Sequence, residues 1–423
     1  MYLYRRALTA AVVLAAAVTG GCDNFLSVEN PGVIEEGTID PVADAETFSL
    51  SAQTNFFNAY DNVALYGAFF SGEAWVDDTY AGRKEIARRN VNDRDALLVA
   101  DLYQPLAVAA TSNLHVLEIL RGTAKEVSLS SARAALNLGF SLQLMAETFC
   151  QGVLAVGAPM TQQETSREAI RYLLQAVELA TAVGDANIVL AARVGLARAY
   201  LQVGDHAEAA AAAASVPADF RYDALKVDDA SSRTRLGNTI YYYTAARPNL
   251  VVPPYYRALQ DARIPFALLT DPQTGAPVGG QGGMLAYFYQ RKYTGFGAPM
   301  RLASGLEARY LQAEAELALG DPSRAIALTE ERRAAYASAQ DGDAVDFVSE
   351  TGPLTDLLDQ KSRDFFLEGK HMGDWIRNPD ATPYVVPSGS SNYDVVYGGA
   401  VGAATCFPIP AVERENNPNF PRS

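Results

Sequence analysis

Two short stretches of the chain, 116 residues apart, carry the same pattern and decide the expected fold. Residues 197–205 read ARAYLQVGD, and residues 313–321 read AEAELALGD. In each stretch a small residue is followed seven positions later by Gly, and an Ala stands five positions further on, at Ala209 and Ala325. Small residues let two helices approach closely, and Gly tolerates the left-handed turn that ends a helix. The stretches therefore predict two helix–turn–helix units of one kind.

This pattern is that of the tetratricopeptide repeat, in which paired helices stack side by side. The separation of 116 residues excludes an uninterrupted array, because such repeats follow one another every 34 residues. A less regular unit is expected from a helix around 132–148 paired with one around 168–180. The alternative is that both stretches are chance amphipathic hairpins. We expect a helical scaffold over about 105–215 and 300–377.

The rest of the chain has a different composition. Residues 220–299 are rich in Gly, Pro and aromatic residues, which is typical of loops and short strands. The tail, residues 378–423, has the same loop-like character. The fold class expected is therefore mainly α, with helix pairs supporting an irregular, loop-rich half that contains short β-hairpins. A single domain is expected over residues 22–423.

Residues 1–21 have the features of an export signal peptide. Arg5 and Arg6 precede an apolar stretch that is too short to span a membrane, and Gly20 and Gly21 then lead directly into Cys22. Small residues before a cysteine are typical of a bacterial lipoprotein processing site. We expect Cys22 to be lipidated and the lipid to be the only anchor, because no later segment is a membrane-spanning apolar run. The alternative is an ordinary signal peptide cleaved near the same point.

Charge and composition exclude several classes of function. The formal net charge is −15, and it becomes −17 if residues 1–21 and their two arginines are removed. Such a balance argues against a nucleic-acid partner, whose phosphates require a basic surface. The chain has only three histidines, widely spaced, which excludes a His-rich metal site, and we expect no cofactor. Cys150 and Cys406 remain after Cys22, and an exported chain favours a disulfide between them over two buried thiols.

Three segments resemble the SusD/RagB family of outer-membrane nutrient-binding lipoproteins. Residues 22–31, CDNFLSVENP, are similar to that family's lipid cysteine and the segment after it. Residues 364–377, DFFLEGKHMGDWIR, are similar to its late helical motif, with His371 where Arg is usual. Residues 407–419, FPIPAVERENNPN, fit its C-terminal signature. The positions that match the helical motif are Glu368, Gly369, Asp374 and Arg377.

The resemblance implies a fold of tetratricopeptide-like helices beside an irregular half. It further implies a lipid-anchored protein of the outer membrane, exposed at the cell surface, that has no enzymatic activity. Members of the family capture glycans, or less often peptides. They deliver this nutrient to a partner, a TonB-dependent outer-membrane barrel of the SusC type.

Candidate ligand-binding residues follow from the chemistry of sugars, whose apolar ring faces stack on aromatic planes while polar side chains bond the hydroxyls. Residues 72–83, GEAWVDDTYAGR, are expected to form an exposed loop. Its candidates are Trp75, Asp77, Asp78, Tyr80 and Arg83. A second, strand-like candidate is the run Tyr241, Tyr242 and Tyr243. In both places the alternative is that the aromatic rings simply pack in the core.

Two other classes of function stay open. One is a surface glycan hydrolase, which needs two carboxylates across the sugar, but the sequence contains no catalytic motif and no catalytic residue is expected. The other is a scaffold lipoprotein that uses its helical surface and aromatic loops to hold another protein.

Overall fold

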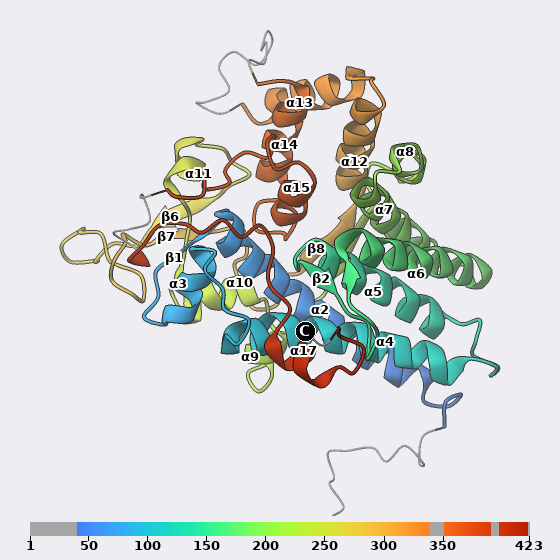
Figure 1. Ribbon diagram of the computed structural model, residues 1–423. Helices are drawn as coiled ribbons and strands as arrows, with labels where there is room; N and C mark the ends of the chain where they lie inside the picture. Colours follow the sequence, from blue (N-terminus) through green and yellow to red (C-terminus); the bar gives the residue numbers. More distant parts are fainter. Residues whose placement is uncertain (1–39, 338–350, 391–396, 422–423) are drawn as a thin grey trace, which may run out of the picture.

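The computed structural model describes residues 40–337, 351–390 and 397–421 (Figure 1). The predicted signal peptide, the lipidation site Cys22 and the family-like segment at residues 22–31 lie outside the described residues. Among the described helices, none combines the length and the apolar character needed to cross a lipid bilayer.

The described chain is mainly helical, with short two-stranded ribbons, which confirms the expected fold class. The longer helices are α2 (Ala45–Ser71), α4 (Gln104–Leu120), α5 (Leu129–Ala146), α6 (Gln162–Val183), α7 (Ala186–Val203), α8 (His206–Ala214), α12 (Gly305–Ala318), α13 (Ser323–Ala335) and α14 (Pro353–Asp364). Shorter helices are α3 (Ala81–Ala87), α9 (Arg233–Leu236), α10 (Thr239–Tyr241), α11 (Pro254–Ala258), α15 (His371–Arg377) and α17 (Ala411–Asn416), with π-helical segments η2 (Leu98–Tyr103) and η3 (Tyr242–Ala246).

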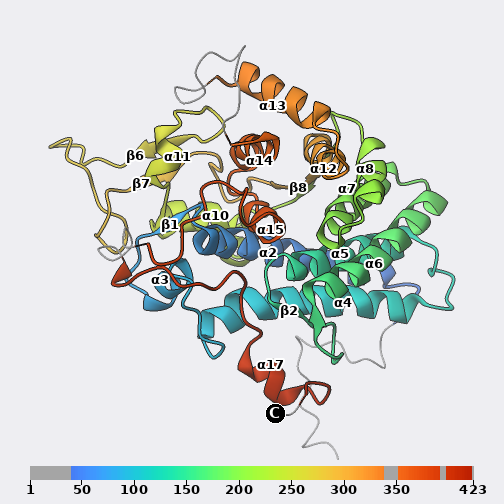
Figure 2. The same cartoon turned by 45° about the horizontal axis from the view of Figure 1, so that its top comes forward.

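Both predicted helix–turn–helix units are present. Helices α7 and α8 meet at Gly204, whose φ is +85°, and α12 and α13 meet at Gly320, whose φ is +96°. These are left-handed conformations that Gly adopts without strain. Helix α8 packs against α12, so the two units stack although they lie far apart in the sequence. The less regular pair also forms, as α5 against α6 (Figure 2).

A short β-ribbon explains how two distant units can stack. Strand β4 (Arg221–Ala224) pairs antiparallel with β8 (Met300–Ser304), so the insert between them leaves and rejoins the scaffold at one place. Ser304 is also the N-cap of α12, because its hydroxyl accepts the N–H of Glu307. The start of α12 is thereby fixed beside the end of α8.

The insert contains more helix than its composition suggested. It holds α9, α10, η3 and α11 together with short strands, and two further ribbons form. These are β1 (Trp75–Val76) with β5 (Leu250–Val251), and β6 (Phe266–Leu268) with β7 (Phe288–Gln290). The expectation of a strand-like run at Tyr241–Tyr243 is wrong, since these tyrosines lie in α10 and η3. The side chain of Asn238 accepts the N–H of Tyr241, and this N-cap outweighs the β propensity of tyrosine.

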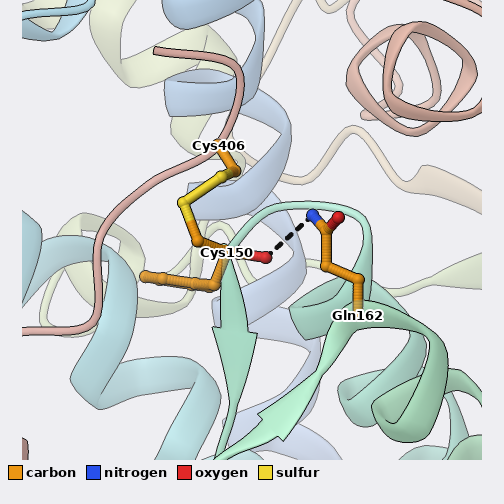
Figure 3. The surroundings of a disulfide bond; sticks show 4 residues. Cys150, Gln162 and Cys406 are labelled. Carbon is orange, nitrogen blue, oxygen red and sulfur yellow. Dashed lines mark hydrogen bonds between the residues drawn. A yellow bond between two sulfur atoms is a disulfide. The ribbon is translucent and has the colours of Figure 1, made fainter.

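The C-terminal segment is fastened to the end of α5. The disulfide expected between Cys150 and Cys406 is present (Figure 3). Beside it, Phe407 N–H donates to the carbonyl of Thr148. Gln162 donates from its side-chain amide to the carbonyl of Phe149, the residue before Cys150, at 2.9 Å. The ribbon of β2 (Gln151–Gly152) and β3 (Met160–Thr161) follows directly. The tail is therefore held across the scaffold despite its loop-like sequence.

The family-like segment at residues 364–377 is not one continuous helix. Helix α14 ends at Asp364 and α15 begins at His371, whereas a helical motif was expected over the whole segment. The chain turns between them through left-handed conformations at Leu367 and Gly369. Gly369 has a φ of +69°, and a Cβ atom on it would lie 3.2 Å from Ala64 of α2, so both the backbone conformation and the close approach favour Gly here.

Beneath this turn lies a set of eight charged side chains, four acidic and four basic, which we call the buried ion cluster. Its members are Glu147, Glu307, Glu314 and Asp374 with Arg198, Lys361, Lys370 and Arg377. Each side chain is at most 7% exposed. Lys361 contacts Asp374 at 2.6 Å, and Arg377 contacts Glu314 at 3.1 Å. The cluster joins the helix pairs to α14 and α15.

The basic side chains of the buried ion cluster lower the pKa of two of its acids, Glu307 and Glu314. Burial alone would raise the pKa of Glu307, but Arg198 and Lys370 outweigh it and lower that pKa to about 2. His371, which stands where the family usually has Arg, takes no part in the cluster. Its ring nitrogens lie 3.0 Å from the Ser71 hydroxyl and 2.8 Å from the Pro383 carbonyl, and burial lowers its pKa.

Candidate ligand-binding cleft

A cleft of about 440 Å³ lies between α2, the η2–α4 segment and the α9–η3 segment. Its volume falls within the ordinary range of ligand sites. The side chains that line it are mostly amides, hydroxyls and aromatic rings. They are Asn55, Asn58, Asn62, Tyr66, Ala100, Asp101, Gln104, Pro105, Val108, Thr234, Arg235, Thr239, Tyr242 and Tyr243.

Helix α2 supplies one wall as a row of polar side chains. Asn55, Asn58, Asn62 and Tyr66 are spaced three, four and four residues apart, which places them on one helix face. The row extends for about 16 Å along the helix axis, given the rise of an α-helix. The opposite face of α2 is occupied by core residues such as Phe56.

The second wall runs antiparallel to α2. Tyr66 donates its hydroxyl proton to Asp101 at 2.6 Å, and Asn55 lies 3.4 Å from the hydroxyl of Ser112, further along α4. Two contacts in this order fix the direction of the wall. The cleft therefore has a tyrosine end, near Asp101, and an open end, near Val108, whose side chain is 44% exposed.

Both π-helical segments of the described chain border the cleft. Segment η2 contributes Ala100 and Asp101, and η3 contributes Tyr242 and Tyr243. A π turn widens the helix by one residue and interrupts the regular side-chain order, and such turns occur frequently at functional sites. Two of the walls of this cleft therefore depart from regular α-helical geometry, as is frequent at functional sites.

The third wall is held by a buried ion pair beneath its start. Asp61 of α2 accepts the N–H of Thr239 at 3.1 Å and contacts Lys226 at 2.6 Å. Lys226 also donates to the carbonyl of Phe57, so both charges have partners although both side chains are fully buried. The pair fixes the first residue of α10 against α2, with Asn62 as its neighbour in the cleft.

A second buried ion pair stands behind the other end of the same wall. Arg83 donates to Asp78 at 2.7 Å and to the hydroxyl of Tyr243 at 2.9 Å, and its guanidinium lies over the Tyr243 ring. Burial would raise the pKa of Asp78, but the N–H of Tyr80 and the Arg83 guanidinium outweigh it and lower that pKa. The planar guanidinium can serve both partners at once. Arg83 is thus a positioning residue for Tyr243.

These contacts change the interpretation of residues 72–83. The expectation of an exposed loop is wrong for Asp77, Asp78 and Arg83, which are buried. Each of these charged side chains forms hydrogen bonds with other groups of the protein. Trp75 is half-buried in β1 and packs edge-on against Tyr255. Tyr80 is 46% exposed but does not line the cleft.

Asp77 has a structural role of its own. Its carboxylate accepts the N–H groups of Met284 and Leu285 at 3.1 and 3.0 Å. A Cβ atom on Gly282 would lie 2.3 Å from the Asp77 carboxylate, so the glycine-rich turn is needed for this close approach. The turn is therefore an internally bonded structure beside β1 and β5.

The tyrosine run contributes two of its three members to the cleft. Tyr242 and Tyr243 line it, with rings 5.1 Å apart in an edge-to-face arrangement, whereas Tyr241 packs against Phe296 outside it. The two candidate regions of the sequence do meet, through the bond from Arg83 to Tyr243. The asparagines of α2 were missed. Their signal was polar residues at helical spacing within an otherwise apolar helix.

The polar groups of the cleft differ in how far they are satisfied. Within the described part of the chain, no protein group forms a hydrogen bond with the side-chain amides of Asn58, Asn62 or Gln104. The same holds for the guanidinium of Arg235, which no described carboxylate contacts. These groups are available to bond a ligand.

Comparison with known proteins gives a result at the level of the fold. No protein-family model matches the sequence, and no curated protein matches it. A SusD superfamily protein from Bacteroides thetaiotaomicron superposes with a TM-score of 0.66 at 17% identity, covering 88% of this chain and 99% of that one. The chain has the SusD fold. The fold-level resemblance seen in the sequence is thereby confirmed.

Two further solved structures share this SusD fold. A SusD superfamily protein from Parabacteroides distasonis gives a TM-score of 0.65 at 14% identity, covering 91% of this chain and 99% of the other. Surface glycan-binding protein A from Bacteroides thetaiotaomicron, in complex with laminarihexaose, gives 0.62 at 12% identity and covers 89% and 98%. The likeness therefore extends over nearly the whole length of each protein.

Proposed function

We propose that this protein captures a glycan in the cleft between α2, η2–α4 and α9–η3. The observation that carries the proposal is the convergence of unsatisfied amides, Asn58 and Asn62, with the aromatic side chain of Tyr242 in one cleft. Amides donate and accept hydrogen bonds, as sugar hydroxyls require, and an aromatic ring can stack on a sugar face. A protein with the same fold, surface glycan-binding protein A, is in complex with laminarihexaose, which supports a glycan as the ligand.

We further propose that the protein is anchored to the outer membrane by a lipid on Cys22 and delivers its ligand to a TonB-dependent transporter barrel of the SusC type. The support is the lipoprotein pattern at Cys22 together with the SusD fold. Binding, not hydrolysis, is favoured because Asp101 is the single carboxylate among the described residues that line the cleft. Glycoside hydrolysis ordinarily needs a pair of carboxylates.

Glycan binding is tested by calorimetry of the purified protein against a panel of soluble oligosaccharides. We expect saturable binding to at least one of them without turnover of the sugar. Replacing the aromatic ring of the cleft, in the variant Tyr242→Ala, should weaken that binding. Absence of binding across the panel, or release of smaller sugars during the titration, would contradict the proposal.

Anchoring and partnership are tested in native membranes. Cys22→Ser should move the protein from the membrane fraction to the soluble fraction. Capture of the tagged wild-type protein in gentle detergent should recover a large TonB-dependent barrel in near-equal amount. Recovery of the protein alone, under conditions that keep other membrane complexes intact, would contradict delivery to a transporter.

A further inference from the structure

The shape and charge of the cleft define the class of glycan more narrowly, and this inference rests on the proposed function. We infer that the ligand is an uncharged glycan chain of several rings that lies along α2. It is not a single sugar and not a polysaccharide bearing carboxylates. Shape supports the first part of this inference and charge supports the second.

The cleft is elongated. Its α2 wall runs from Asn55 to Tyr66, about 16 Å along the helix, which exceeds the length of one sugar ring. The facing wall runs the opposite way from Asp101 to Val108. Amide side chains stand at successive turns of α2, so each ring of a chain laid beside the helix can meet one.

The two ends of the cleft differ. At one end Tyr66 and Tyr243 are buried, tied to Asp101 and Arg83. At the other end Val108 is 44% exposed. A chain can therefore extend into solvent past Val108, while its other end meets the tyrosine wall. This arrangement fits a segment of a longer glycan.

Charges at the cleft cancel. Its lining holds one acid, Asp101, and one base, Arg235. Behind the lining, Asp61 is paired with Lys226 and Asp78 with Arg83, so neither pair leaves a free charge to attract an ion. A carboxylate on the ligand would gain only Arg235, an exposed cation whose pairing is weak in water.

The net charge of the whole protein also disfavours an anionic ligand. The net charge, −15 for the full chain and −17 without residues 1–21, repels a polyanion before it reaches the surface. Uncharged sugars are not repelled in this way, and the uncharged amides of Asn58 and Asn62 can form hydrogen bonds with their hydroxyls. The lining therefore selects for neutral rings.

The first experiment compares glycans on the wild-type protein by calorimetry. The probes are mono-, di-, tetra- and hexasaccharides of glucose, xylose, mannose and galactose, together with oligogalacturonate and oligomannuronate. We expect one neutral series to bind, with affinity rising at least tenfold from the monosaccharide to the tetrasaccharide. Its Kd should change less than twofold between 50 and 500 mM NaCl, because no ion pair forms with the ligand.

The outcomes separate the inference from the proposed function. Tighter binding of a uronate series that weakens with salt would overturn the inference and leave glycan capture standing. Binding that reaches full strength with a monosaccharide would also overturn it. Failure of every glycan to bind would overturn the proposed function itself.

Variants of α2 test where the glycan chain lies in the cleft. Asn58→Ala and Asn62→Ala should each weaken binding about fivefold, as expected for the loss of one or two hydrogen bonds. Asn187→Ala, an exposed asparagine on α7 outside the cleft, is the matched control and should leave the Kd unchanged. Equal affinities for all three variants, with each shown by circular dichroism to be folded, would overturn the placement along α2.

Discussion

The buried ion cluster and the cleft are both rich in polar side chains, but these side chains differ in whether other protein groups bond to them. In the cluster, four acids and four bases satisfy one another under α15, out of contact with water. In the cleft, the amides of Asn58 and Asn62 have no partner among the described residues and face solvent. Polar groups that are satisfied internally hold the fold together, and polar groups left open are available to a ligand.

The pairs behind the cleft stand between these two extremes. Asp61–Lys226 and Asp78–Arg83 are buried and satisfied like the cluster, but they fix the cleft wall that carries Thr239 and Tyr243. The comparison therefore distinguishes residues that would touch the ligand from residues that position them. Arg83 and Asp78, candidates for ligand contact in the sequence, belong to the second kind.

The largest expected effect comes from opening the cluster. Arg198→Met removes the cation that contacts Glu307 and lies 3.7 Å from Glu147, so these buried carboxylates lose their shared cation and keep only the longer contacts with Lys370 and Arg377. We expect the free energy of unfolding to fall by about 3–5 kcal/mol, measured by urea denaturation. Arg171→Met, which breaks the exposed pair with Glu168, is the control and should cost less than about 1 kcal/mol. Equal losses for the two variants would contradict the assigned role of burial.

Glu73 is a buried acid that, unlike the acids of the buried ion cluster, has no described cation in contact. Burial raises the pKa of Glu73 to about 8, and no described Lys or Arg forms an ion pair with it. The unfolded chain loses this proton near pH 4.5 and the folded chain near pH 8, so stability falls as pH rises between these values.

Glu73→Gln should remove that loss while its amide oxygen still accepts the N–H of Leu367. We expect the variant to be more stable than wild type by about 4 kcal/mol at pH 8 and equal to it at pH 4. Thermal unfolding across this pH range measures the difference. A constant difference between the two proteins at every pH would show that Glu73 does not titrate abnormally.

The cleft is tested next by removing its half-buried aromatic ring. Tyr242→Ala should weaken glycan binding about tenfold, since stacking contributes on the order of 1 kcal/mol beyond the area it buries. Its effect on unfolding should be small compared with Arg198→Met, because the Tyr242 ring is partly exposed. Calorimetry and thermal unfolding of the same sample check both statements. A variant that unfolds readily yet binds at wild-type affinity would place Tyr242 with the core.

The smallest effect is expected at Tyr80, which lies outside the cleft although it is exposed. Tyr80→Ala should change the Kd for the same glycan less than twofold, because Tyr80 is not among the lining residues and is linked to Tyr243 only by way of Arg83 in the contacts of the described residues. Titration beside Tyr242→Ala gives the ratio. If Tyr80→Ala is the more damaging change, the loop at residues 72–83 and not the cleft binds the sugar.

Much of the helical architecture could be predicted because it depends on local sequence patterns. The turn glycines at Gly204 and Gly320 and the Ser304 cap act within a few residues, so the helix pairs were predictable. The disulfide followed from the number of cysteines in an exported chain. The end of α14 at Asp364 and the left-handed turn at Leu367 could not be predicted, because leucine has no local preference for that backbone conformation.

The cleft was only half predictable for the same reason. Tyr242 and Tyr243 stood out as an aromatic run, but the asparagines of α2 are polar residues whose meaning depends on what faces them. Asp77 and Asp78 looked like solvated acids, yet the fold brings Met284 and Asn249 to them across about two hundred residues.

The helical units, their turns and the composition of the loop-rich half follow from local sequence, because backbone preference and capping depend on near neighbours. Which polar side chains bond to other parts of the protein and which remain available to a ligand depends instead on the packing of distant segments. Satisfaction of a charge or an amide requires a partner within hydrogen-bonding distance, and in this chain those partners come from segments far apart in the sequence.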